Sequence, residues 1–373
     1  MRVGNEKLVL SLVRQHGALS KSEIARMTGL SAQTVSVIMR ALETEGLLLR
    51  GEPVRGKVGQ PSVPMRLNED GAYFLGLKVG RRSTEMVLTD FLGKVRKRSL
   101  KTYAYPTPEA TLSFANDEID RLINSLAPGE RDRIAGLGIA MPFFLWHWAQ
   151  TLNVPQERMD VWRTADLQAE LSKKHSLPIL VQNDMTAACG AELVFGPQSG
   201  PRDFLYFYIG YFIGGGVVLD GQIYSGRGNA GALGPLPVTG ANGRVEPLLG
   251  PGSLVTLEKA LVADGYGADV LWETTHAWDI PARYIAHWQR NAARAIAHAA
   301  VSASSIIDFE CVKIDGWLPE TLRETLVAEI EMEVSKFNLT GLQRPRIEAG
   351  SIGPDARALG AASLPLSDRY LGP

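Results

Sequence analysis

The residue pair Asn183-Asp184 is the first feature of the sequence that could do chemistry. It follows a short apolar run, Ile179-Leu180-Val181, that is typical of a buried strand, and it precedes a segment expected to be helical. At the carboxyl end of a strand in an α/β sheet, polar side chains face the crevice where ligands bind. A carboxylate there could accept a proton or hold hydroxyl groups. The alternative is a local role, because Asn and Asp are also common in turns and at helix N-termini.

Patterns that would indicate a metal centre or a bound nucleotide are incomplete. The chain has only two cysteines, Cys189 and Cys311, which excludes a disulfide scaffold and a four-cysteine zinc module. The segment 51–58, GEPVRGKV, nearly matches the phosphate-binding pattern GxxxxGK[ST]. Val58 has no hydroxyl for magnesium, and no helix is expected after it to hold a phosphate. We therefore expect no metal site and no cofactor.

A second group of polar residues lies on one predicted helix near the N-terminus. The spacing of Val35, Ile38 and Leu42 predicts a helix from Ala32 to about Glu45, with Ser31 as its N-cap. Short polar side chains on the other face could hydrogen-bond to base edges, and a longer cation could reach guanine or a phosphate. The candidate DNA-binding residues here are Ser31, Gln33, Thr34, Ser36 and Arg40.

The elements around this helix predict a winged helix-turn-helix domain. A helix from Asn5 to about His16 comes first, and the capping box Ser20-Lys21-Ser22-Glu23 opens a second helix. The turn Thr28-Gly29-Leu30 joins it to the helix at Ala32, so the pair forms a helix-turn-helix. In that motif the second helix lies in the major groove. The alternative is a helical protein-interaction domain.

The charge distribution supports contact between this segment and a polyanion. Residues 1–67 hold ten Lys or Arg and five Glu, a net charge of +5, although the whole chain of 373 residues carries −1. The Gly-, Pro- and Arg-rich stretch from Gly51 to Pro64 is interpreted as a wing running into a linker. In this wing, Arg55 and Lys57 could contact phosphate or the minor groove.

The rest of the chain has the pattern of an α/β body. The segments 74–80, 85–90 and 94–103 predict a run of three strands, and strands and helices alternate later, up to a long helix from Ala286 to Ile307 and a strand at 312–314. Apolar residues make up 45% of the sequence, enough for a sizeable core. The longest apolar run, 134–146, is too short to span a bilayer. No signal peptide is apparent, so we expect a cytoplasmic protein.

The order of these segments resembles the ROK family (repressor, open reading frame, kinase) over about residues 5–365. The resemblance is carried by the helix-turn-helix and by FLGLKVGRRSTEMVLTDFLGKV, VQNDMTAACGAE, IGGGVVLDGQIYSGRGNAGALG and SIGPDARALGAA. The regulator branch of that family implies a winged helix on a two-lobed actin/hexokinase-like body. The expected domains are 1–67 (winged helix-turn-helix), 68–185 (first lobe) and 186–373 (second lobe, with its C-terminal segment returning to the first).

The resemblance also assigns roles to individual residues. In ROK kinases, the Asn-Asp pair that matches Asn183 and Asp184 holds sugar hydroxyls, and its Asp is the catalytic base. The first phosphate loop, DxGGT, corresponds here to 78–83, KVGRRS, which lacks the acid that positions magnesium. The second, GTGIGGG, corresponds to 210–216, where Tyr211 and Phe212 would crowd a phosphate. These departures from the family's pattern predict a protein that does not transfer phosphate and has no catalytic residues.

The family's zinc and sugar contacts are also altered. The residues that align with the sugar-binding Glu, His and Glu of the family are Ala232, Pro235 and Leu249, and 241–249 contains no cysteine for the zinc cluster. The remaining candidates for an effector pocket in the interlobe cleft are Asn183, Asp184, Asn229, Trp162 and Glu246. For Trp162 the alternative is a place in the core.

Together these features predict a regulator, and a repressor of carbohydrate-related genes in particular, that binds operator DNA as a homodimer or homotetramer. Its body would sense a sugar or sugar derivative without phosphorylating it. Two alternatives stay open: a regulator controlled by a protein partner without a small-molecule effector, and an active sugar kinase that kept a helix-turn-helix.

Overall fold

The structure is a computed structural model that describes residues 4–53, 62–197, 200–240 and 243–372. The chain divides into two compact units, each of which is considered by itself. The first contains the described residues up to Asp184, together with 197, 200 and 358–372; the second contains 185–196 and 201–357. The helix α14 (Ala356–Tyr370) thus belongs almost entirely to the first unit. No helix among the described residues is long and apolar enough to cross a membrane.

The N-terminal domain is a three-helix, three-strand winged helix. Its helices are α1 (Gly4–His16), α2 (Lys21–Thr28) and α3 (Ala32–Thr44), and its strands are β1 (Ala18–Leu19), β2 (Leu48–Arg50) and β3 (Met65–Leu67). The strands form one antiparallel sheet in the order β1-β3-β2. Gly29 closes α2 with φ +70°, a conformation that favours glycine. The predicted helices are confirmed to within one residue at their starts. Strand β3, the return strand of the wing, was not predicted.

The body of the first unit is a five-stranded sheet in the order β6-β5-β4-β7-β8. Strands β4 (Tyr73–Val79), β5 (Ser83–Thr89) and β6 (Val95–Thr102) are antiparallel, as the three-strand prediction required, whereas β7 (Ile134–Met141) and β8 (Ile179–Asn183) run parallel to β4. Helices α4 (Pro108–Asn124) and α8 (Leu167–Ser172) contribute to a core against this sheet. The other short helices of this unit are η1 (Glu69–Gly71), α5 (Pro128–Arg131), η2 (Leu145–Trp148), α6 (Ala149–Leu152), α7 (Gln156–Asp160) and η3 (Val161–Arg163).

The second unit repeats the same strand arrangement. Its sheet order is β11-β10-β9-β14-β15, with β9 (Phe204–Ile209), β10 (Ile213–Leu219) and β11 (Gln222–Ile223) antiparallel, and β14 (Cys311–Gly316) and β15 (Arg346–Ala349) parallel to β9. A hairpin of β12 (Pro237–Thr239) and β13 (Val245–Pro247) stands apart. The helices are α9 (Asp184–Phe195), α10 (Leu254–Ala263), α11 (Val270–Glu273), α12 (Ala282–Ser304) and α13 (Glu320–Val334), with η4 (Gly353–Asp355) before α14.

Helix α12 differs from its predicted range, 286–307. It begins at Ala282, directly after Pro281, and its regular turns end at Ser304. Proline fixes its own φ and is accepted at the edge of a helix, so Pro281 sets a start four residues earlier than the alanine-rich pattern indicated. Helices α10 and α13 and the β12–β13 hairpin were not predicted.

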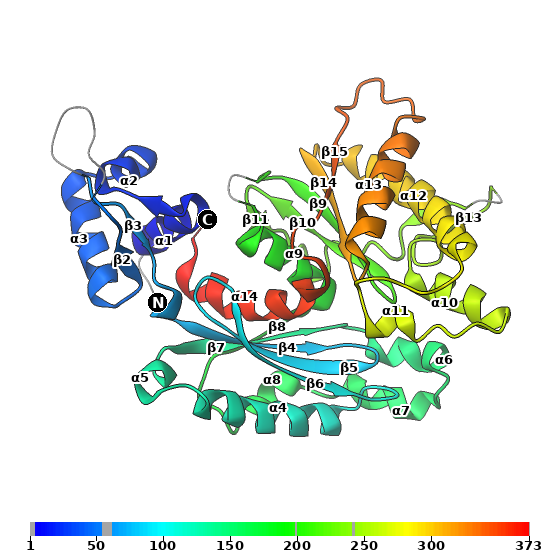
Figure 1. Ribbon diagram of the computed structural model, residues 1–373, viewed down its shortest axis with the longest axis horizontal. Helices are drawn as coiled ribbons and strands as arrows, with labels where there is room; N and C mark the ends of the chain where they lie inside the picture. The colour runs from blue at the N-terminus through cyan, green and yellow to red at the C-terminus, as the bar shows by residue number, and fades with distance from the viewer. Residues whose placement is uncertain (1–3, 54–61, 198–199, 241–242, 373) are drawn as a thin grey trace. The chain divides into compact units, whose positions relative to one another are not determined.

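Helix α14 lies against the bare backbone of β4 and β7, on the face opposite α4 (Figure 1). A Cβ on Gly138 would stand 1.8 Å from the carbonyl oxygen of Ala361, and one on Gly76 would stand 2.7 Å from the Ala358 carbonyl oxygen and the Ala362 nitrogen. Real Cβ atoms do not approach other atoms so closely. Glycine at both positions is therefore what lets α14 rest directly on the sheet.

We predict that Gly138→Ala lowers the free energy of unfolding of the first unit by about 1–3 kcal/mol, because the added methyl forces α14 away from the sheet. Urea unfolding measures this effect. Gly129→Ala is the matched control, since Gly129 is exposed and an added Cβ meets no atom within 4 Å. Equal midpoints for Gly138→Ala and the wild type would contradict the close contact.

Candidate nucleic-acid interface and ligand site

Helix α3 has the caps and the burial pattern of a recognition helix. Ser31 caps it, with its Oγ accepting a hydrogen bond from the Thr34 backbone N–H at 3.1 Å. Val35, Ile38, Met39 and Leu42 face the domain core, as the sequence spacing predicted. At the start of α2, the predicted capping box is confirmed: the Ser20 backbone N–H donates to Glu23 Oε2 at 2.8 Å, and the Glu23 N–H donates to Ser20 Oγ at 3.3 Å. These local bonds fix how α3 is presented.

The outward face of α3 carries a polar stripe with one apolar residue in it. Gln33 and Arg40 are exposed and Ser36 is half-buried. Val37, whose side chain is 65% exposed, lies on the same face, since positions 33, 36, 37 and 40 share helical spacing. An exposed apolar group there can contact a thymine methyl. Val37 is not among the candidates predicted from the sequence, because only polar residues were considered, although its helical spacing places it on the same face as Gln33 and Arg40.

Ser31 and Thr34 lie at the start of α3, where they also bond to each other. Their hydroxyl oxygens are 2.8 Å apart, so part of their hydrogen-bonding capacity is used within the helix cap. Arg50, at the end of β2, pairs with Glu43 of α3 at 2.6 Å and so has a carboxylate partner of its own. The predicted wing residues Arg55 and Lys57 lie outside the described residues. Among the described candidates, Ser31, Gln33 and Arg40 are exposed, whereas Thr34 and Ser36 are half-buried.

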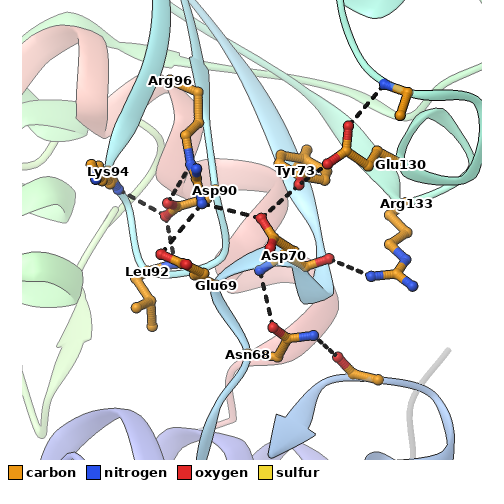
Figure 2. A network of polar contacts seen from close by, with 12 residues as sticks. Asn68, Glu69, Asp70, Tyr73, Asp90, Leu92, Lys94, Arg96, Glu130 and Arg133 are labelled. Atoms are coloured by element: carbon orange, nitrogen blue, oxygen red, sulfur yellow. Dashed lines mark hydrogen bonds and ion pairs between the residues drawn. The ribbon is translucent and has the colours of Figure 1, made fainter.

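A polar network ties the winged helix to the first-unit sheet at residues 68–70 (Figure 2). The Asn68 side-chain amide donates to the carbonyl oxygen of Gly46, at the end of α3, at 2.7 Å. The Asp70 carbonyl accepts from Arg133 at 2.7 Å, and the Asp70 carboxylate accepts from Arg96 at 3.1 Å. Arg96 also bonds to the buried Asp90 carboxylate at 2.8 Å. The end of the recognition helix is thus connected to strands of the body by hydrogen bonds.

Helix α1 provides a second connection to the body. The Arg14 guanidinium donates to the carbonyl oxygen of Phe91 and lies over the Phe91 ring, 5.4 Å from its centre. Burial lowers the pKa of Arg14 to about 10, and the nearby Asp90 carboxylate opposes that shift. The residue therefore stays charged at neutral pH, held by groups of the β5–β6 turn. Lys7 adds a hydrogen bond to the Asp368 carbonyl oxygen of α14 at 2.6 Å.

Asn183 and Asp184 stand where β8 ends and α9 begins. Asn183 is the last residue of β8, with its N–H bonded to Gln182 Oε1 at 2.7 Å, and Asp184 is the first residue of α9. Asp184 is only 2% exposed and Asn183 is half-buried. A polar pair at the carboxyl end of a parallel strand has the placement expected for ligand binding. Asp184 closes the first unit along the chain and Met185 opens the second.

The turn between β4 and β5 has basic residues where a phosphate loop would need open backbone and an acid. Lys78, at the position of the acid in the kinase pattern, is 6% exposed and pairs with Glu85 at 3.0 Å. Glu85 also pairs with Arg98 at 3.2 Å. The turn is closed by hydrogen bonds, with Tyr103 OH bonded to the Gly80 carbonyl oxygen at 2.6 Å. The Glu85 carboxylate is thus engaged by two cations, Lys78 and Arg98.

The second candidate phosphate loop, 210–212, is hydrogen-bonded to the start of helix α10. The backbone N–H groups of Leu254 and Val255, which begin α10, donate to the carbonyl oxygens of Gly210 and Tyr211 at 3.1 and 3.2 Å. Free N–H groups at a helix N-terminus are what would hold a phosphate. Here the loop's carbonyls occupy them. Tyr211 packs against Phe212 and Trp272, with ring centres 4.8 and 5.3 Å away.

The other three candidate effector residues lie at separate places in the chain, Trp162 in the first unit and Asn229 and Glu246 in the second. Trp162 was the wrong choice for a sugar-stacking surface: it lies in the first-unit core, 4% exposed, and its indole N–H donates to the Pro106 carbonyl oxygen at 3.0 Å. A ring buried on both faces has none to offer a ligand. Asn229 is exposed in a turn of the second unit. Glu246 lies on β13 and lines a pocket that includes none of the other four residues.

No metal centre is found in the part of the chain that the structure describes, where no three His, Cys, Asp or Glu side chains are grouped to hold an ion. Cys189 and Cys311 are both buried and free. Burial raises the pKa of Cys311 to about 12 and that of Cys189 above its usual value, with Glu348 and Glu192 respectively adding to the effect. Thiols in this state are not nucleophilic at neutral pH.

Comparison with known proteins assigns the two parts of the chain. Residues 74–251 match the ROK family, and residues 4–48 match a winged helix-turn-helix DNA-binding domain. The chain is 26% identical over 235 residues to the xylose repressor of Bacillus subtilis, covering 63% of this chain and 60% of that protein. The chain therefore spans about 60% of the length of that curated relative.

Two solved structures share the fold. A ROK family transcriptional regulator, described as a homologue of the E. coli MLC protein, matches 98% of this chain and 96% of its own, with 19% identity and a TM-score of 0.68. The ROK hexokinase from Thermus thermophilus matches 78% of this chain and 97% of its own, with 20% identity and a TM-score of 0.55. The fold is that of an α/β sugar-kinase-like body preceded in the chain by a winged helix, and the likeness to the ROK family is carried by residues 74–251.

Proposed function

We propose that this protein is a DNA-binding transcriptional repressor that responds to a sugar or sugar derivative and does not phosphorylate it. One observation carries the proposal: a capped recognition helix with an outward polar stripe is attached to a ROK body whose two candidate phosphate loops are closed by their own residues. The similarity to a protein named xylose repressor, and the fold shared with a ROK family transcriptional regulator, point the same way.

The kinase alternative meets two physical obstacles in this chain. Phosphoryl transfer needs metal ions and donors placed around the phosphates. At the first loop a buried Lys78–Glu85 pair stands in place of the metal-binding acid, and at the second loop the amides of α10 are already bonded. We therefore assign Asp184 to ligand binding and give it no part in proton transfer.

The response to a ligand would depend on the link between winged helix and body. A ligand changes DNA affinity only if it binds one arrangement of the protein better than another. The bond of Asn68 to Gly46 joins the winged helix to the segment 68–70, whose Asp70 bonds to Arg96 of β6. The bond of Arg14 to Phe91 joins α1 to the turn after β5. A change in the position of those elements would be transmitted to α3 through bonds of this kind.

The first prediction concerns base recognition. Arg40→Ala should weaken binding to the operator by about 1–3 kcal/mol, and Gln33→Ala should reduce discrimination between bases by a similar amount, because both side chains project from α3. Fluorescence anisotropy with operator and scrambled DNA measures both effects. Lys97→Ala, an exposed cation on β6, is the matched control and should bind as the wild type does. Unchanged base preference for Gln33→Ala would show that another face of the domain reads DNA.

The second prediction concerns the effector. A thermal-shift screen of sugars, sugar alcohols and sugar phosphates should find a ligand, and magnesium–ATP should give no shift. Asp184→Asn should then abolish release of operator DNA by that ligand and leave DNA binding without ligand near wild type, since the substitution removes the acceptor charge while keeping the size of the side chain. Release at the wild-type ligand concentration would place the ligand elsewhere. No shift with any compound would favour the regulator controlled by a protein partner.

The third prediction concerns assembly. We expect a homodimer or homotetramer, because one recognition helix reads few base pairs and specific operators usually contain two half-sites. Sedimentation velocity at micromolar concentration, with and without operator DNA, should show a species of at least twice the 40.5 kDa chain mass. A single 40.5 kDa species under both conditions would be inconsistent with this assembly.

A further inference from the structure

The second unit holds a pocket that the proposed function does not use. It has a volume of about 580 Å³ and lies between the β12–β13 hairpin, α10 and α12. This is within the range of ordinary small-molecule sites. Its polar lining consists of Thr239, Glu246, Thr256, Arg283, Tyr284, His287, Arg290, Asn291 and Arg294. Every lining residue falls between 239 and 294, so the pocket is complete within the second unit.

We infer that this pocket binds a small polyhydroxylated anion, a sugar phosphate or a sugar acid, at a site distinct from Asn183 and Asp184. The inference depends on the separation of charges across the pocket. Arginines on α12 provide one wall and the Glu246 carboxylate on β13 provides the other. No ion pair joins Glu246 to an arginine in the described residues, so neither charge is neutralised by the opposite wall.

The Glu246 carboxylate lies beside two glycines. A Cβ on Gly240 would stand 1.9 Å from Glu246 Oε1, and one on Gly250 would stand 3.3 Å from Oε2. The carboxylate therefore approaches the backbone of Gly240 closely. Among the described residues it has no hydrogen-bond or ion-pair partner, and it is half-buried. A carboxylate in this setting can accept hydrogen bonds from two hydroxyl groups of a ligand.

The other wall is a polar stripe on α12 that carries three arginines. Positions 283, 287, 290, 291 and 294 recur at helical spacing, so their side chains share one face. Arg283 already bonds to the hydroxyls of Tyr266 and Tyr284, both at 3.3 Å. Arg290 and Arg294 are exposed and have no carboxylate within 4 Å in the described part of the chain, although Glu329 exerts an attraction on Arg290. These two guanidinium groups can bind a phosphate or carboxylate in bidentate fashion.

Hydrogen bonds connect the elements that form the pocket walls. The Thr239 backbone N–H donates to His298 Nδ1 at 3.0 Å, which ties the hairpin to α12. The indole N–H of Trp288, on the pocket's apolar side, donates to the Ser253 carbonyl oxygen at 2.9 Å, which ties α12 to the start of α10. A preformed pocket with donors on one side and an acceptor on the other suits a ligand with an acidic group and hydroxyls, and it suits a neutral sugar less well.

Isothermal titration calorimetry on the full chain tests this inference. The probes are glucose 6-phosphate, ribose 5-phosphate, gluconate, glucose and inorganic phosphate. We expect at least one of the first three to bind, and the best of them to bind at least about tenfold more tightly than glucose or inorganic phosphate. Arg290→Gln with Arg294→Gln should weaken it by at least about tenfold, the usual size for losing a charged hydrogen bond.

Four further variants separate this site from others. Ala260→Phe, which fills the pocket from α10 without changing its charge, should abolish binding. Glu246→Gln should weaken the sugar anions but leave inorganic phosphate unchanged. Arg344 is an exposed arginine in the segment between α13 and β15. Arg344→Gln and Asp184→Asn should both bind as the wild type does. Because Asp184 is the residue that the proposed effector response requires, its variant separates failure of that proposal from failure of this one.

Several outcomes would overturn the inference. One is the absence of binding by all three sugar anions at millimolar concentration. Another is equal affinity for glucose 6-phosphate and inorganic phosphate in the wild type, which would mean that only the charge is recognised. A third is unchanged affinity in both Ala260→Phe and the double arginine variant, with thermal midpoints showing that both remain folded.

Discussion

The contact between α14 and the glycines of β4 and β7 is the constraint on which the first unit depends. Because Gly138 and Gly76 have no side chains, the backbone of α14 lies directly on the sheet. The end of this helix then reaches two further elements: Tyr370 packs against Phe74 and Phe91, with ring centres 5.9 and 5.0 Å away, and the Gly372 N–H bonds to Ser11 of α1 at 3.0 Å. One helix thereby connects the sheet to the DNA-binding domain.

In this chain, polar groups at the two candidate phosphate loops are bonded to other groups of the protein. Lys78 pairs with Glu85 in the first unit, and the first amides of α10 bind the 210–211 carbonyls in the second. A buried acid outside the two loops is also bonded internally: at the carboxyl end of β14, Asp315 pairs with Arg323 at 2.9 Å and accepts from the Gly353 N–H at 3.0 Å. Burial raises the pKa of Asp315. Opening any of these sites to a ligand would leave a buried charge or amide without its partner, which is costly.

Features set by short-range chemistry could be predicted from the sequence, and features set by distant packing could not. Ser20, Ser31 and Gly29 define helix ends by bonds within a few residues. The starts of α2 and α3 could therefore be predicted to within one residue. Trp162 and Glu246 depend on what lies next to them in space. The Trp162 ring is buried among residues far along the chain, and the Glu246 carboxylate lines a pocket together with residues of α10 and α12. The role of α14 required knowing that Gly138 faces it, which no local pattern indicates.

The connection at Arg14 bears on how a body of this kind could control DNA binding. A buried guanidinium is stable only while its partners stay in place, because burial has removed its water. Three groups that act on it, the Phe91 carbonyl and ring and the Asp90 charge, belong to the β5–β6 turn. A shift of that turn would remove these contacts from the buried charge, so intermediate positions of α1 are disfavoured relative to the bonded one. Such a junction favours discrete arrangements of the winged helix, which is the kind of two-state element that ligand-controlled DNA release requires.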